Sequence, residues 1–252
     1  MHSGRLQSVH WLTSLIAVAI GCALLLPITA SAQPGGGHPD FSGVWFPQGF
    51  ARRTPNPPPF TEAAQKLVDE FNATFTADDD SGKYCIWPGV PRVIWGAPFA
   101  IEVFHRPQDV TIYWEGYGMY RKIYMADHDP PEPIVPTAMG HSLAHWEGDT
   151  LVVETTHLRP YPYMDSLPTS SDARVTERFS LETREQDGEM RDFLVAEVTL
   201  IDPKIYSEPV QLRGEIRRDP ELHILEYTCS TTLWEEYLIE KGLTLPDVDA
   251  LP

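Results

Sequence analysis

The residues best suited to chemistry in this chain are acids and histidines in segments that otherwise read as apolar strands. Glu177 shares one face of its predicted strand with Val175 and Phe179, and a carboxylate in such surroundings must be paired, hydrogen-bonded or protonated. An internal salt bridge that fixes the register of the strands is one interpretation, since ion-pair networks also hold buried acids. Three arginines are conceivable partners: Arg92, Arg121 and Arg178.

Acid–base catalysis is the other interpretation, and whether the chain is an enzyme stays open. A proton donor and a proton acceptor in one lined pocket are enough for a lyase, isomerase or hydrolase type of reaction. The candidates for these roles are His141, Glu177 and Tyr120. No cofactor is predicted, because the chain has no Gly-x-Ser-x-Gly elbow, phosphate loop, dinucleotide fingerprint or His-Glu-x-x-His pattern.

His141 and His145 have the spacing of a metal pair on a helix, but their segment predicts a strand. Four strand residues span roughly 13 Å, so one ion cannot bind both side chains. His105, His128 and His157 fall at strand ends or in loops without ligand spacing. No metal site is predicted.

Tyrosines and tryptophans are concentrated in the middle of the chain, where they indicate a binding site. Apolar rings with polar tips are suited to binding a hydrophobic small molecule that contains oxygen, and they are equally suited to an ordinary barrel core. Tyr117 lies in this run, and Tyr161 and Tyr163 stand in a loop broken by prolines. The predicted ligand-binding residues are Trp87, Trp95, Tyr113, Trp114, Tyr124, Trp146, Glu102 and Arg121.

Residues 140–155, GHSLAHWEGDTLVVET, must position several of these side chains. Gly148 and Asp149 predict a two-residue type II′ turn between two strands. In that register Trp146 faces Leu151 on a core face, and the histidines and glutamates occupy the other face.

The pattern of the remaining chain predicts an all-β fold with a helix over residues 61–75, capped by Thr61, and a short C-terminal helix over residues 232–241. Several strands are apolar on both faces, which favours a lipocalin-like antiparallel meander barrel of about ten strands. A two-sheet β-sandwich is the alternative. The expected strands cover residues 40–46, 99–105, 109–115, 119–125, two within 140–157, 174–182, 190–201, 209–217 and 222–229.

The N-terminal segment indicates export. A single arginine, a long apolar run and a small-x-small pattern ending at Ala32 are typical of a signal peptide, with a membrane anchor or a lipidated Cys22 as alternatives. The predicted organisation is a signal peptide over residues 1–32, a flexible linker over 33–39 and a single β-barrel domain over 40–252.

The 252-residue chain has a formal net charge of −17, which opposes binding to nucleic acid or to anionic membranes. We therefore expect a periplasmic or extracellular protein without stable membrane insertion after signal cleavage. Its oligomeric state stays open.

Cys85 and Cys229 remain once the leader is set aside, and an even pair in an oxidising compartment predicts a disulfide. Closing so long a loop would contribute on the order of 4–5 kcal/mol in the chain-entropy model. A nucleophile or a metal ligand is the rival interpretation, although neither cysteine has a second Cys or a His at ligand spacing.

Five short motifs are distributed along the chain: CxxPGxPR at residues 85–92, YRKIY at 120–124, GHSxxxWEGDTLVVET at 140–155, TERF at 176–179 and EYTC at 226–229. In these motifs the chain resembles a family of exported bacterial β-rich proteins that have no settled activity. The resemblance implies a secreted β-rich fold and supplies no catalytic residues. Gly43-x-Trp45 is in addition similar to the Gly-x-Trp of the first lipocalin strand.

These observations predict an exported β-barrel that binds a hydrophobic or aromatic small molecule. A cofactor-independent enzyme with His, Glu and Tyr in the barrel pocket is the first alternative. An envelope protein-interaction module that uses an exposed sheet edge is the second.

Overall fold

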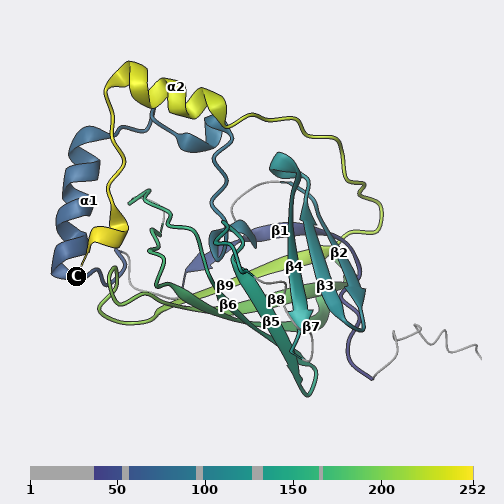
Figure 1. Cartoon of the computed structure of the whole chain (residues 1–252). Coiled ribbons are helices and arrows are strands. Elements are labelled where there is room, and N and C mark those ends of the chain that lie inside the picture. Colours follow the sequence, from purple (N-terminus) through teal and green to yellow (C-terminus); the bar gives the residue numbers. More distant parts are fainter. Residues whose placement is uncertain (1–36, 53–56, 95–98, 127–132, 165–166, 252) are drawn as a thin grey trace, which may run out of the picture. The chain divides into compact units, whose positions relative to one another are not determined.

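Strands that follow one another in the chain lie side by side in the fold, and the first strand pairs with the last to close a barrel (Figure 1). The computed structural model describes residues 37–52, 57–94, 99–126, 133–164 and 167–251. The strands are β1 (Gly43–Arg52), β2 (Ile101–Arg106), β3 (Asp109–Trp114), β4 (Met119–Met125), β5 (His141–Glu147), β6 (Thr150–Thr156), β7 (Arg174–Gln186), β8 (Glu189–Ile201) and β9 (Val210–Arg218).

The predicted all-β barrel is confirmed, with nine strands in the described residues in place of about ten. Residues 222–229, predicted as the last strand, have no strand structure. β9 pairs with β8 on one side and with β1 on the other, so both of its edges are already used when the chain reaches this segment. The backbone N–H of Leu225 instead donates to the carboxylate of Glu115 at 2.9 Å.

The prediction of an antiparallel meander throughout is wrong at one position, because β4 and β5 run parallel. β4 ends at Met125 and β5 begins at His141. A connection of this length can carry the chain back to the starting end of β4, whereas a two-residue turn could produce only an antiparallel pair.

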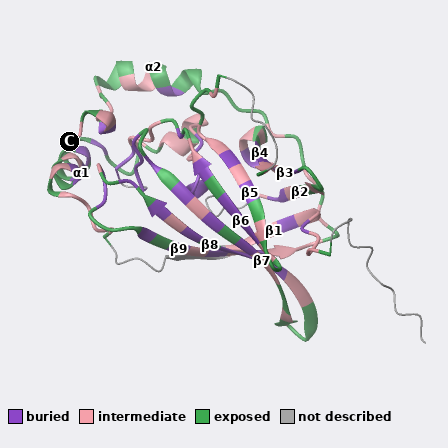
Figure 2. Cartoon of the chain, turned by 60° about the horizontal axis from the view of Figure 1, so that its bottom comes forward, coloured by how far each residue is buried: buried purple, intermediate pink, exposed green. Residues whose placement is uncertain are grey.

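Alternate residues along the strands point into the barrel and form its hydrophobic core, which appears in Figure 2 as bands of buried residues. The predicted hairpin register is confirmed: Trp146 is opposite Leu151, and Ala144 is opposite Val153. Gly148, at the first position of the two-residue loop, has φ +60°, which fits the predicted turn.

The two predicted helices are also confirmed. α1 (Glu62–Thr74) begins after Thr61, whose hydroxyl accepts a hydrogen bond from the Ala64 N–H at 3.1 Å. α2 (Thr232–Lys241) follows the long connection from β9 (Figure 1). Its Trp234 packs against Tyr84, with ring centroids 5.3 Å apart.

Short 3₁₀ helices occupy two of the connections and the segment after α2. These are η1 (Ser81–Tyr84), η2 (Arg92–Ile94), η3 (Gly116–Gly118) and η4 (Val248–Ala250).

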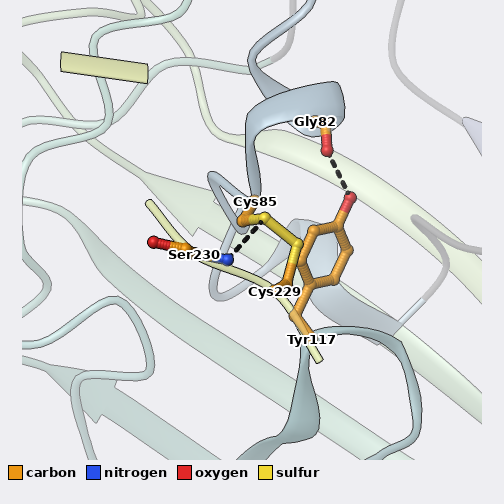
Figure 3. Close-up of a disulfide and its surroundings, with 5 residues drawn as sticks. All are labelled: Gly82, Cys85, Tyr117, Cys229 and Ser230. Carbon is orange, nitrogen blue, oxygen red and sulfur yellow. Dashed lines mark hydrogen bonds between the residues drawn. A yellow bond between two sulfur atoms is a disulfide. The ribbon is translucent and has the colours of Figure 1, made fainter. Parts of the chain in front are cut away.

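A disulfide joins Cys85, at the end of η1, to Cys229, which confirms the predicted pair (Figure 3). The two Cα atoms are 5.7 Å apart, and the Ser230 N–H donates to the sulfur of Cys85 at 3.0 Å. The bond therefore ties the segment before α2 to the segment that contains η1.

By its contacts, the chain from Gln33 to Pro252 forms one compact unit. The predicted signal peptide, and Cys22 with it, lie outside the described residues. Within the described residues, no helix is long and apolar enough to span a membrane.

Candidate functional site

Arg121 and Glu177 form an ion pair inside the barrel, where each side chain is 1% exposed. The two terminal guanidinium nitrogens of Arg121 donate to the two carboxylate oxygens of Glu177, one of them at 3.0 Å. Arg121 also donates to the hydroxyls of Ser142 at 3.1 Å and Thr155 at 2.7 Å. The salt-bridge interpretation of Glu177 is therefore the one that the geometry supports, because its carboxylate is fully engaged by a fixed partner.

The structure does not bring the proposed catalytic group together. Neighbouring residues of a strand point to opposite faces, so His141 faces outward where Ser142 faces the barrel interior. His141 stacks on Tyr124 of β4, with ring centroids 5.9 Å apart, on the outer face. Tyr120 is 66% exposed on that same face. The barrel wall thus separates Glu177 from His141 and Tyr120.

Most of the predicted ligand-binding residues do not converge, although Arg121 and Tyr124 line one cavity. Trp114 is 2% exposed in the hydrophobic core. Trp146 stacks on His38, with centroids 4.4 Å apart, and Glu102 lines a shallow cavity with Phe104. Tyr113 pairs in register with Tyr120, whereas Trp95 lies outside the described residues.

Tyr124 and Arg121 line a cavity of about 620 Å³ between β4 and residues 133–141. Tyr120 and His141 contribute to the same cavity.

Another site is built around Trp87, in two adjacent cavities of about 540 and 260 Å³. We call these two cavities together the tyrosine groove. Phe71 of α1, Phe75 directly after this helix, and Tyr117 of η3 add aromatic surface to the larger cavity. Six residues line both cavities: Ile86, Trp87, Pro88, Arg92, Tyr161 and Tyr163.

Backbone contacts fix the walls of the tyrosine groove. Gly89 adopts φ +61°, and a Cβ atom there would lie 2.2 Å from the carbonyl oxygen of Ala138. This close approach lets the Val90 N–H donate to the same oxygen at 3.0 Å. Tyr161 exchanges two backbone hydrogen bonds with Thr169, at 2.8 and 3.0 Å. The side chains of the groove therefore stand on constrained backbone.

Trp87 is 7% exposed and packs against the ring of Tyr117, with centroids 4.5 Å apart. Its indole N–H is buried and has no acceptor among the described residues. A buried donor without a partner costs free energy, on the order of 1–3 kcal/mol, unless a ligand or a water accepts from it. Among the described residues that were predicted to bind a ligand, Trp87 is the one that lines this groove.

Two tyrosine hydroxyls of the groove, those of Tyr117 and Tyr163, are neutral over the physiological range. The Tyr117 hydroxyl donates to the Gly82 carbonyl at 2.9 Å, and burial raises its pKa (Figure 3). Burial also raises the pKa of Tyr163. These groups therefore act as hydrogen-bonding groups on an apolar wall and are poor bases at neutral pH.

Arg92 lies at the junction of the two cavities and is 7% exposed. It donates to three backbone carbonyls: those of Pro88 at 2.8 Å, Val90 at 3.5 Å and Leu167. Its guanidinium carbon lies 3.9 Å from the centroid of the Tyr161 ring. Burial lowers the pKa of Arg92 to about 10, so the group is still a cation at neutral pH.

The sequence analysis identified several residues of this groove but did not predict that they lie together. Tyr117, Tyr161 and Tyr163 are conspicuous aromatic residues, and Arg92 stands in a rigid Pro-rich segment. Their convergence depends on long-range contacts that no local spacing encodes. Among the described residues, no group of three or more His, Cys, Asp or Glu side chains is placed to hold a metal ion.

Comparison of the chain with known protein families, with curated proteins and with solved structures finds no match. The site must therefore be interpreted from its own geometry.

Proposed function

We propose that this protein binds a hydrophobic or aromatic small molecule in the tyrosine groove. The observation that carries the proposal is the buried indole N–H of Trp87, which has no acceptor among the described residues and belongs to a residue that lines both cavities. A ligand with an oxygen or nitrogen acceptor would satisfy this donor.

The size and the lining of the groove support the same proposal. Its larger cavity, of about 540 Å³, falls within the range of roughly 300–1,000 Å³ that is typical of small-molecule sites. Aromatic rings supply apolar contact area, and a few fixed polar groups supply orientation. In this proposal the ligand binds beside the barrel, because side chains of the hydrophobic core occupy the barrel interior.

The two alternative functions have less support. An acid–base enzyme that uses Glu177 with His141 would need both groups in one pocket, and they lie on opposite sides of the barrel wall. A module that binds through an exposed sheet edge would need an unpaired strand, and each of the nine strands in the described residues pairs on both sides along at least part of its length.

Export remains part of the proposal. A disulfide between Cys85 and Cys229 suits an oxidising compartment such as the periplasm or the extracellular space. The predicted signal peptide and the resemblance to exported β-rich proteins agree with this location.

Titration with N-phenyl-1-naphthylamine, a neutral aromatic probe that fluoresces in apolar surroundings, tests the proposed function. Asn72 and Ala73 are neighbours on the exposed side of α1, and of the two only Asn72 lines the groove. We expect Asn72→Trp to fill the cavity and weaken probe binding at least tenfold, and Ala73→Trp to leave it unchanged. Absence of probe binding, or equal effects of the two variants, would contradict the proposal.

A further inference from the structure

We propose that the ligand of the tyrosine groove carries a carboxylate-class anionic group and that Arg92 binds it. This inference rests on the proposed function and adds the charge of the ligand to it. Its basis is the placement of a buried guanidinium where the two aromatic-walled cavities meet.

The charge of Arg92 is not balanced by an acid within the described part of the chain. Its hydrogen-bond acceptors are main-chain carbonyls, and it forms no ion pair there. A buried cation without a counter-ion is costly, and such groups are concentrated at functional sites. An incoming anion would supply the missing charge.

Arg92 also has hydrogen-bonding capacity to spare. A guanidinium carries five N–H bonds, and three of them are used by the carbonyls of Pro88, Val90 and Leu167. The two unused N–H bonds lie one on each terminal nitrogen, and two donors of this kind suit the two oxygens of a carboxylate.

Both basic and acidic side chains line the two cavities of the groove. Exposed Arg159 lines the smaller cavity together with Arg92, and its charge is close enough to act on Tyr163. The acids that line the cavities have other roles: Asp79 accepts from Tyr237 at 2.5 Å, and Asp80 accepts from the Gly82 N–H at 2.9 Å.

Glu235, the remaining acid of the lining, forms no ion pair among the described residues and faces the smaller cavity from α2. In this proposal the anionic group of the ligand binds Arg92. The aromatic body of the ligand lies between Trp87 and the tyrosines.

Displacement of N-phenyl-1-naphthylamine by two matched competitors tests this inference. 2-Naphthoate and 2-naphthamide share one ring system and differ in the charge of one group. We expect 2-naphthoate to bind roughly 10- to 100-fold more tightly, the range expected of hydrogen bonds to a charged group. Equal affinity of the two competitors would overturn the inference and leave the proposed function intact. Failure of the neutral probe itself to bind would overturn both.

Variants of the two arginines identify the group responsible. Arg92→Gln should remove the preference for 2-naphthoate, and Arg92→Lys, which keeps the charge but lacks the planar fork, should keep part of it. Thermal melts check that the variants fold. Arg159→Gln, at an exposed position, should reduce the preference by roughly two- to fivefold without a risk to folding. A full preference in all three variants would overturn the assignment to Arg92.

Discussion

Arg121 and Glu177 connect β4 to β7 across the barrel interior, although these two strands do not pair with each other. The residues are 56 positions apart in the sequence, and two strands stand between them in the sheet. A buried ion pair of this kind is expected to fix the register of the barrel more than to increase its net stability, since desolvation offsets the Coulomb attraction.

Removal of one member of this pair should destabilise the fold strongly. Glu177→Gln leaves Arg121 as an unbalanced buried charge, and we expect a loss of about 3–5 kcal/mol in the free energy of unfolding. The double variant Arg121→Met/Glu177→Leu should recover most of this loss. Urea denaturation of the three proteins measures the coupling. The exposed pair of Arg178 and Glu147 is the control, and breaking it should have little effect.

If Glu177→Gln unfolds as the wild type does, the ion pair is not a structural element. That result would again make Glu177 a candidate for acid–base catalysis, because its carboxylate would not be required for the ion pair with Arg121.

Local sequence patterns predicted those parts of the fold that local contacts decide. The hairpin from His141 to Thr156 and the Thr61 cap of α1 follow from neighbours a few residues apart. The pairing of Cys85 with Cys229 followed from the number of cysteines and from the predicted export, because no third cysteine remained outside the predicted signal peptide.

The remaining features depend on contacts between distant segments. The parallel pairing of β4 with β5 follows from how their long connection packs, and alternation of apolar residues is the same for either strand direction. Closure by β1 and β9 leaves residues 222–229 without a strand to join, although their sequence reads as one. The tyrosine groove combines α1, η1, η3 and the loop at Tyr161, so no window of sequence contains it.

The disulfide should stabilise both the fold and the groove. Cys85 and Cys229 are 144 residues apart, so the chain-entropy model gives roughly 4–5 kcal/mol for the constraint. Reduction should lower the free energy of unfolding by up to this amount and weaken binding of the neutral probe, because Cys85 lies between groove residues Gly82 and Ile86. The variant Cys85→Ser/Cys229→Ser should show the same loss and no response to reductant. A reduced protein with unchanged stability would contradict this prediction.

His105 should make the fold sensitive to mild acid. Burial lowers its pKa below the ordinary value of 6.5; the charge of Asp40 opposes this shift, and His38 adds a smaller lowering effect. In the fold its Nδ1 faces the Phe41 N–H at 3.4 Å, which requires a neutral ring. The unfolded chain therefore binds more protons just below pH 6.5, and the stability that neutral His105 contributes above this value is lost as the pH falls through its lowered folded-state pKa.

The difference in unfolding free energy between wild type and His105→Gln measures this contribution. It should be largest at pH 7.5 and decrease toward pH 5. A constant difference for His105→Gln would show that the histidine does not couple protonation to folding.

Alanine substitutions at Gly89 and Gly148 allow the free-energy cost of backbone strain to be distinguished from the cost of a steric clash. Both have φ near +60°, but a Cβ at Gly148 meets nothing within 4 Å, whereas a Cβ at Gly89 lies 2.2 Å from the Ala138 carbonyl oxygen. Gly148→Ala should therefore cost about 1–2 kcal/mol, the strain of the left-handed conformation alone. Gly89→Ala should cost roughly 1–3 kcal/mol more, because the backbone of the groove must move.

Probe binding distinguishes the two variants further. Gly89 lies between Trp87 and Arg92, so a shift of its backbone changes the lining of both cavities. Gly89→Ala should weaken binding of N-phenyl-1-naphthylamine, and Gly148→Ala, in a hairpin turn that does not line the groove, should leave it unchanged. Urea denaturation and the probe titration together check this. If Gly89→Ala binds the probe with wild-type affinity, the contact between Gly89 and Ala138 does not position the groove.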